Sequence, residues 1–347
     1  MLAGTREDSG AVIIVGDDPW CDSTQVPADS RYLAEHLRLP IIEPSCPQEV
    51  KDWIPLAFKL GQAGRIYIGY SMTTLLADGG GTVTCYENHY PQVNEHQRRT
   101  LSYEKDIEPS LEQTVLLPPR TWKREIGLEE RFNAVKAEAR KLGINRILYR
   151  PQKGEVVPMG FVAAGCAHAY LVHALNELGL LGRIPILKLG MYYPLDEQIV
   201  TEFARQCQQL IVIEERRGFV ERQILEALTP LRQSGELDTQ VYGKQFPKPH
   251  PGIPATRGLN PSILIERLVP LLRDHAGLPG ELTNGKLSRE LERIQSTATY
   301  DVQIPSRTAT FCPGCPHRDS ASVLLELRRD LRDPTYMLER HKCNRWT

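Results

Sequence analysis

The amino-acid sequence predicts an α/β protein in which two alternating strand–helix units are joined by a longer connection. Short, continuous apolar runs, such as A-V-I-I-V at 11–15 and I-P-I-L-K-L at 184–189, are typical of strands buried in a parallel sheet. Stretches with helical spacing of apolar residues follow these runs after short connections. Strands and helices that alternate in this way favour a parallel sheet with helices packed on it.

The first alternating unit is assigned to residues 1–76. Its strands are expected at 11–15, 40–42 and 66–70, with a short helix at 30–37. A longer helix should begin near Ser45, with Gln48 completing a capping box. Pro55 should kink this helix, because proline removes a backbone donor.

Residues 77–155 are predicted to form a linker that contains one helix. G-G-G at 79–81 and P-P at 118–119 interrupt any periodic pattern. The helix is expected at 128–142, where apolar residues recur on one face.

The second alternating unit, at 156–245, is predicted to be a doubly wound domain. Its strands are expected at 161–164, 184–189 and 210–213, and its helices at 165–178, 195–207 and 219–228. Gly165 joins a strand to a helix without the three-glycine fingerprint, so it indicates close packing rather than phosphate binding. Glu214 and Glu215 end a strand ahead of a helix, and the positive helix terminus explains them without catalysis. Residues 246–305 form a connector, with helices expected at 261–272 and from 286.

Composition excludes several classes of function. The formal net charge is −1, whereas proteins that bind nucleic acid or anionic membranes usually have a basic surface. No apolar stretch reaches membrane-spanning length, and the first ten residues lack the apolar core of a signal peptide. Eight cysteines in such a chain fit reduced thiols, so a cytoplasmic location is expected.

The turn C-P-G-C at 312–315 is the most reactive feature of the sequence. A helix should follow it, capped by Asp319 or Ser320, with Val323, Leu324, Leu327 and Leu331 on a buried face. The positive end of that helix would favour thiolates. Four interpretations stay open: a thioredoxin-like pair, which needs more chain after the motif; a zinc site with His317, His341 or Cys343; an iron–sulfur site; and two buried thiols. A metal or cluster site is favoured over buried thiols.

The stretch D-D-P-W at 17–20 follows the first predicted strand. Open α/β sheets bind ligands beyond the carboxyl ends of their strands, so this loop is a candidate site. Asp-Pro also begins ordinary turns, and spacing alone favours a capped turn.

The order of these pieces resembles the thiamine-diphosphate-dependent 2-oxoacid:ferredoxin oxidoreductases, most closely the large (alpha) subunit of the indolepyruvate type. The resemblance rests on G-D-D-P-W, P-I-I-E-P-S, G-F-V-A-A-G-C-A-H-A-Y, I-L-K-L-G-M-Y-Y-P-L, L-I-V-I-E-E, V-Y-G-K and C-P-G-C-P-H-R. It implies a multidomain thiamine-diphosphate-enzyme architecture: the C-terminal part of a pyrimidine-binding domain at 1–76, a transketolase-C-terminal-like domain at 156–245, and the start of a diphosphate-binding domain at 306–347.

The resemblance also implies a reaction and its site residues. The reaction is oxidative decarboxylation of an aryl 2-oxoacid, with ferredoxin as electron acceptor, coenzyme A as acyl acceptor and a second (beta) subunit as partner. Cofactors would be thiamine diphosphate with Mg²⁺, and a [4Fe–4S] cluster held by Cys312 and Cys315. His317 and Arg318 would lie near the cofactor, and Asp17, Asp18, Ser23 and Gln25 in a loop facing the substrate.

The sequence departs from the family pattern in three places. The glutamate that activates thiamine and the G-D-G…N motif for Mg²⁺ and diphosphate have no match, and V-P-A-D at 26–29 stands where the family has N-E-Q-D. The chain is therefore expected to be a central piece of the subunit, truncated at both ends and inactive alone. One alternative is a non-catalytic metal-binding α/β module that docks onto a partner subunit. Another is an unstable product whose half-sheet cannot bury its own edge.

Overall fold

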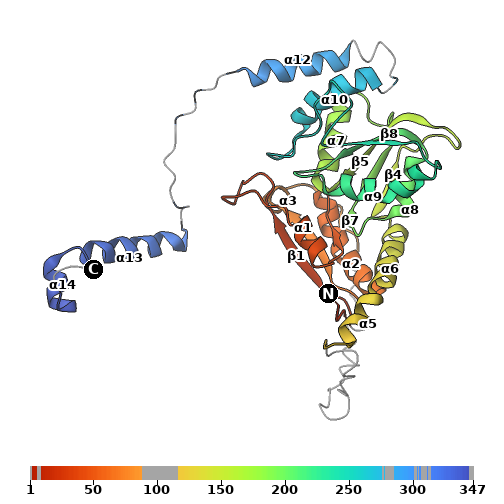
Figure 1. The fold of residues 1–347 in the computed structure, drawn as a ribbon. Helices are drawn as coiled ribbons and strands as arrows, with labels where there is room; N and C mark the ends of the chain where they lie inside the picture. Colours follow the sequence, from red (N-terminus) through yellow and green to blue (C-terminus); the bar gives the residue numbers. More distant parts are fainter. Residues whose placement is uncertain are drawn as a thin grey trace. The chain divides into compact units, whose positions relative to one another are not determined.

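A computed structural model describes residues 2–5, 9–87, 116–275, 277, 285–300, 303, 305, 311 and 314–343 of the chain. By its internal contacts the chain divides into two units, residues 1–298 and residues 299–347. The larger unit contains two sheets with helices packed on them (Figure 1).

The first sheet has the strand order β1-β3-β2-β7. Strands β1 (Val12–Asp17), β2 (Ile41–Ile42) and β3 (Ile68–Thr73) run parallel, as their alternation with helices predicts. Helix α1 (Arg31–His36) connects β1 to β2, and α2 (Pro47–Gly64) connects β2 to β3. A short helix, α3 (Thr74–Asp78), follows β3. Strand β7 (Met191–Tyr193) joins this sheet antiparallel to β2 from far along the chain.

The second sheet has the order β4-β6-β5-β8-β9. Strands β5 (Val157–Ala164), β6 (Ile186–Leu189), β8 (Cys207–Ile213) and β9 (Gln240–Tyr242) are parallel, and β4 (Asn145–Leu148) is an antiparallel edge. The crossover helices are α7 (Gly165–Glu177), α8 (Glu197–Ala204) and α9 (Phe219–Gln233).

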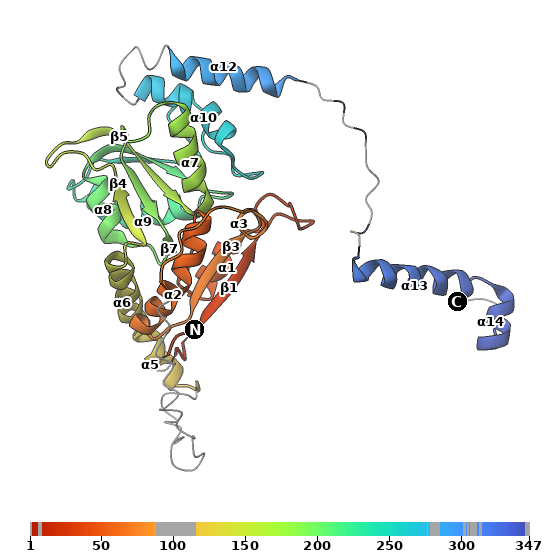
Figure 2. The same ribbon diagram turned by 180° about the vertical axis from the view of Figure 1, so that it is seen from behind.

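Helices cover both faces of the second sheet, so it is doubly wound as predicted. Helices α7 and α10 (Pro261–His275) pack on one face, and α12 (Lys286–Ala298) packs on α10. Helices α8 and α9 pack on the other face (Figure 2). The chain crosses from β5 to β6 on one side and from β6 over β5 to β8 on the other. The topological switch point therefore lies between the carboxyl ends of β5 and β8.

Helix α6 (Leu128–Lys141) follows the short α5 (Arg120–Ile126), and its start agrees with the helix predicted inside the linker. Its apolar face is buried against α2, with Phe132 and Val135 in the same core as Leu60. This helix is thus part of the folded body of the larger unit, and β4 follows it directly into the second sheet.

Gly190 separates β6 from β7 and lets one extended segment serve both sheets. A Cβ at this position would lie 2.4 Å from the Trp53 ring and 2.7 Å from the carbonyl oxygen of Ile144. Only glycine admits such a close approach without displacement of α2. The chain therefore passes directly from β6 of the second sheet to β7 at the edge of the first sheet.

The N-caps predicted for α2 and α13 were wrong. Helix α2 begins at Pro47 with Cys46 as N-cap, and the hydroxyl of Ser45 donates instead to the carboxylate of Glu49. Helix α2 continues through Pro55. In the smaller unit, α13 (Pro316–Asp330) begins directly after Cys315, so Asp319 lies inside the helix. A proline ring fixes φ near the helical value, so proline is favoured at the first position of a helix. This explains why α2 begins at Pro47 and α13 at Pro316.

The described part of the smaller unit consists of α13 and α14 (Pro334–His341). The apolar face predicted to be buried on α13 is exposed at Val323, Leu324 and Leu327. In the described ranges, no helix is both long and apolar enough to cross a membrane.

Replacement of Phe132 by alanine should lower the free energy of unfolding by about 3–5 kcal/mol, because it opens a cavity between α6 and α2. The matched control is Trp122→Ala on α5, whose ring is 61% exposed and whose loss should cost less than about 0.5 kcal/mol. Urea denaturation followed by circular dichroism measures both. Equal, small effects would show that α6 is a peripheral linker.

Candidate functional site

An acidic pocket lies where strands of both sheets end. Asp17 ends β1, Glu43 follows β2, Ala164 ends β5 and Glu214 follows β8, so the pocket includes the topological switch point. It is lined by Asp17, Pro19, Ala28, Asp29, Arg31, Glu43, Thr73, Ala164, Tyr192, Glu214, Glu215 and Arg216. Its walls carry five carboxylates and two guanidinium groups.

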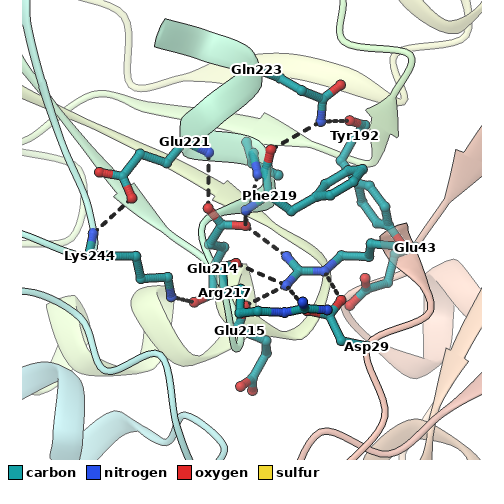
Figure 3. A network of polar contacts seen from close by, with 12 residues as sticks. Asp29, Glu43, Tyr192, Glu214, Glu215, Arg217, Phe219, Glu221, Gln223 and Lys244 are labelled. Carbon is teal, nitrogen blue, oxygen red and sulfur yellow. Dashed lines mark hydrogen bonds and ion pairs between the residues drawn. The ribbon is translucent and has the colours of Figure 1, made fainter. Parts of the chain in front are cut away.

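The buried guanidinium of Arg31 is the centre of this pocket. Its Nε and Nη2 donate to the two carboxylate oxygens of Asp29 at 2.7 and 3.0 Å, and Nη1 donates to Glu214 at 2.7 Å. Nη2 also donates to the carbonyl oxygens of Glu215 and Arg217. Burial alone would lower the pKa of Arg31, but Asp29 and Glu214 raise it overall. Arg31 therefore stays charged and joins α1, next to the first sheet, to the end of β8 in the second sheet. Its partners Asp29 and Glu214 are labelled in the polar network of Figure 3.

Glu214 holds the start of α9. Its carboxylate accepts the backbone N–H groups of Phe219, Val220 and Glu221 at 2.9–3.0 Å. These donors have no partner within the helix, and the helix dipole adds to the attraction. Glu214 was predicted to interact with the positive end of the following helix, and its contacts agree with this. The ion pair of Glu214 with Arg31 was not predicted.

Glu215 has a different environment from its neighbour. One carboxylate oxygen accepts the N–H of Leu259 at 2.9 Å, and the other is buried without a partner in the described part of the chain. The pKa of Glu215 is raised to about 7, mainly by burial and in smaller part by the negative charge of Glu43. Its environment is therefore that of a carboxyl group able to hold a proton near neutral pH.

Glu43 lies against the turn from β5 to α7. Its Oε1 accepts the N–H of Cys166 at 3.2 Å. Gly165 has φ of +51°, and a Cβ there would lie 1.8 Å from the same carboxylate oxygen. The predicted close packing of Gly165 is confirmed, and the group that it admits is a carboxylate. Burial raises the pKa of Glu43 to about 7, although Arg31 acts in the opposite direction.

The predicted substrate loop is organised by Asp18. Its buried carboxylate accepts the N–H groups of Asp22, Ser23 and Thr24 and the Thr24 hydroxyl, at 2.8–3.0 Å. Burial would raise the pKa of Asp18, but these donors lower it to about 2. The capped turn favoured from spacing is therefore present. The side chains of Ser23 and Gln25 are exposed.

Asp17 closes the same loop at its base. Its carboxylate accepts the N–H of Ser30 at 3.1 Å and also bonds the Ser30 hydroxyl. Burial raises the pKa of Asp17. Asp17 lines the acidic pocket, and the structure therefore brings it together with Glu43 and Glu215, which were not predicted as site residues.

The cysteine turn belongs to the smaller unit. Cys312 lies outside the described residues. Cys315 is the N-cap of α13, and its sulfur lies 3.3 Å from Nδ1 of His317. His317 and Arg318 are exposed. Among the residues that the structure describes, no three His, Cys, Asp or Glu side chains form a group that could hold a metal ion. The cluster ligands therefore stay a prediction.

Thiamine diphosphate does not fit the acidic pocket. A diphosphate anion would face five carboxylates, and the guanidinium of Arg31 is already committed to Asp29 and Glu214. Repulsion between a bound diphosphate and these carboxylates would disfavour binding. What the pocket can do chemically is store and release protons, because two of its carboxyl groups have pKa values of about 7.

A second buried charge joins the sheets behind the pocket. Lys188 on β6 is almost fully buried; its ammonium donates to Ser45 at 2.8 Å, forms an ion pair with Glu49 and lies over the Trp53 ring. The sequence signal was present, since a lysine inside the apolar run I-L-K-L requires a buried partner. Arg31 offered no comparable signal, because it begins a polar-looking helix.

Comparisons with known proteins agree with the resemblance. A family model described as the indolepyruvate oxidoreductase domain matches residues 150–299. The indolepyruvate oxidoreductase subunit IorA of Methanothermobacter marburgensis is 30% identical over 319 residues, and IorA of Archaeoglobus fulgidus is 27% identical over 327 residues. These alignments include 91% and 93% of this chain but 45% and 46% of the relatives. The chain thus spans slightly less than half the length of these curated relatives.

A solved structure of a 2-oxoglutarate:ferredoxin oxidoreductase from Magnetococcus marinus aligns with 66% of this chain and 41% of its own chain. The sequence identity is 13% and the TM-score is 0.35, a value too low to support any conclusion.

Replacement of Arg31 by methionine should lower the free energy of unfolding by about 3–5 kcal/mol, because it leaves the carboxylates of Asp29 and Glu214 buried without their cation. Arg217→Met is the matched control. Its guanidinium is largely exposed, lies 3.5 Å from Asp29, and should contribute less than about 1 kcal/mol. Urea denaturation at pH 7 compares the variants, and equal losses would contradict the central role of Arg31.

Glu43→Gln should change how stability depends on pH. The folded-state pKa of Glu43 is about 7, above its ordinary value of 4.5, so the wild type loses stability as pH rises from 4.5 to 7. The variant should lack this loss and become more stable than the wild type at pH 8, by on the order of 3 kcal/mol. Asp18→Asn is the control, because its lowered pKa predicts destabilisation at pH 8. Parallel pH profiles for wild type and Glu43→Gln would refute the assignment.

Proposed function

We propose that the chain belongs with the IorA subunits of indolepyruvate oxidoreductase and is part of the large subunit of a 2-oxoacid:ferredoxin oxidoreductase. The observation that carries this proposal is the homology over nine tenths of the chain. The proposed reaction is oxidative decarboxylation of an aryl 2-oxoacid of the indolepyruvate type, with ferredoxin as electron acceptor and coenzyme A as acyl acceptor. Because the chain spans under half of its relatives, we expect no turnover by the chain alone.

The proposed roles of the chain's own residues follow from their contacts. Arg31 holds Asp29, near the end of the loop at 17–30, against Glu214 at the end of β8. Asp18 makes the loop rigid from within, so that Ser23 and Gln25 are presented on its outer surface. A rigid loop beyond the carboxyl ends of parallel strands supports its proposed role in facing the substrate.

The cofactor roles are proposed from the cysteine motif. Cys312 and Cys315 would hold a [4Fe–4S] cluster, with His317 and Arg318 beside the cofactor. The proximity of Cys315 to His317 supports a shared site. Thiamine diphosphate with Mg²⁺ would supply the carbanion-stabilising chemistry when bound, and the acidic pocket is not its site.

The proposal extends to partners, location and domains. The relatives are named as subunits, which supports a second (beta) subunit as partner. A cytoplasmic location is inferred from composition. The domains at 1–76, 156–245 and 306–347 keep the assignments that the resemblance implies. A non-catalytic metal-binding module is not favoured, because the homology to oxidoreductase subunits extends over most of the chain.

The test is anaerobic purification of the tagged chain from its own cells, together with whatever binds it. The complex should reduce methyl viologen with indolepyruvate and coenzyme A, whereas the isolated chain should not. Cys315→Ser should remove most of the iron, acid-labile sulfide and activity. Cys343→Ser should leave all three unchanged, because Cys343 is exposed and outside the motif.

Other results would contradict the proposal in distinguishable ways. Turnover by the isolated chain would remove the need for a partner. Activity confined to 2-oxoglutarate or pyruvate would overturn the aryl substrate class. Stoichiometric zinc in place of iron, lost in both cysteine variants, would favour the metal-binding module.

A further inference from the structure

The indole ring of Trp20 lies directly against the backbone of Gly258. Trp20 belongs to the turn D-D-P-W that follows β1, and Gly258 belongs to the connector that precedes α10. A Cβ at Gly258 would lie 1.6 Å from Nε1 of Trp20 and 1.9 Å from two carbons of the ring. Only glycine admits the ring this closely, so the contact depends on both residues and joins two segments that are far apart in the sequence.

The connector offers the ring a fixed surface. Leu259, the residue after Gly258, is buried in the core that α7 and α10 share, and its N–H donates to Glu215 at 2.9 Å. The side chain of Asn260 then accepts the N–H of Ile263 in the first turn of α10. Gly258 is itself buried. Trp20 therefore packs on a part of the fold that burial and hydrogen bonds hold in place.

Internal hydrogen bonds determine the shape of the loop at 17–30, but they do not determine its orientation. Asp18 accepts the N–H groups of Asp22, Ser23 and Thr24, all within the loop, and residues 22–27 are exposed. The orientation of the loop on the protein therefore depends on its contacts with other segments. Asp29 supplies one such contact through Arg31, and Trp20 supplies another near the opposite end of the loop.

Trp20 also forms one wall of a small cavity beneath the loop. The cavity has a volume of about 10 Å³, enough for about one water molecule. Cys166 and Tyr170 of α7 line it, as does Glu215, which also lines the acidic pocket. One carboxylate oxygen of Glu215 is buried without a partner in the described part of the chain. The contact of Trp20 with Gly258 thus holds the loop closed over buried polar groups at the carboxyl ends of the strands.

We propose that Trp20 and Gly258 are positioning residues, whose contact holds the loop at 17–30 in the orientation that the 2-oxoacid requires. The inference rests on the proposed function, since it takes this loop to face the substrate. Without the contact, only the end of the loop at Asp29 stays anchored, and several orientations become populated. A substrate that binds one of them then binds more weakly in proportion to that fraction, while turnover of the bound complex stays the same.

Steady-state kinetics of the purified complex with indolepyruvate tests this role. Gly258→Ala should displace the ring and Trp20→Ala removes it, so each should raise KM for the 2-oxoacid on the order of tenfold and leave kcat within about twofold. The double variant should be no worse than either single variant, because both changes remove the same contact. Gly80→Ala is the matched control: a Cβ there meets no atom within 4 Å, and KM should not change.

A second measurement follows the ring itself and needs no turnover. The chain contains four tryptophans, so labelling with 5-fluorotryptophan gives four fluorine NMR signals, and Trp20→Phe identifies the signal of Trp20. In the isolated chain this signal should shift in Gly258→Ala and keep its position in Gly80→Ala. The other three signals should keep their positions in both variants, which shows that the fold is retained.

The results that would overturn the inference are distinct from those that would overturn the proposed reaction. A Trp20 signal that Gly258→Ala leaves unchanged would show that the ring does not depend on this glycine. Unchanged KM in both single variants of an active complex would remove the positioning role and leave the proposed reaction standing. Additive effects in the double variant would show that the two residues act separately. A wild-type complex that turns over no 2-oxoacid would overturn the proposed function, and this inference with it.

Discussion

A buried guanidinium cannot be left without anionic partners, and that requirement organises the centre of this protein. Arg31 begins α1, the helix that connects two strands of the first sheet. Its partners nevertheless include Glu214 at the end of β8 in the second sheet. Because removal of either partner would leave a charge in a low-dielectric interior, the loop at 17–30, the end of β8 and the start of α9 are held together. The acidic pocket exists where these segments meet.

The same junction contains carboxyl groups in two kinds of environment. Asp29 and Glu214 are paired with Arg31, whereas Glu43 and Glu215 are buried with few donors and their pKa values rise to about 7. Glu43 and Glu215 each accept one backbone N–H, whereas Asp29 and Glu214 accept several donors, and this difference separates the two environments. A pocket with this charge distribution is suited to protons rather than to anionic ligands.

The first sheet depends on polypeptide from outside its own alternating unit. Strand β7 forms one edge after Gly190, where the chain leaves the second sheet, and β1 forms the other edge among the residues that the structure describes. The relatives are more than twice as long as the matched region.

Local patterns in the sequence determined the class of the fold. Apolar runs and helical spacing depend only on neighbouring residues, so they predicted the parallel strands, the doubly wound second sheet and the amphipathic helix α6. The tertiary structure alone decided where α6 packs, that β7 leaves its neighbours for the other sheet, and which groups meet in the pocket. Arg31 and Glu214 are 183 residues apart, and no local pattern encodes that contact. Asp18 was predicted to belong to a loop that faces the substrate, and only the structure shows that its carboxylate accepts three backbone donors of that loop.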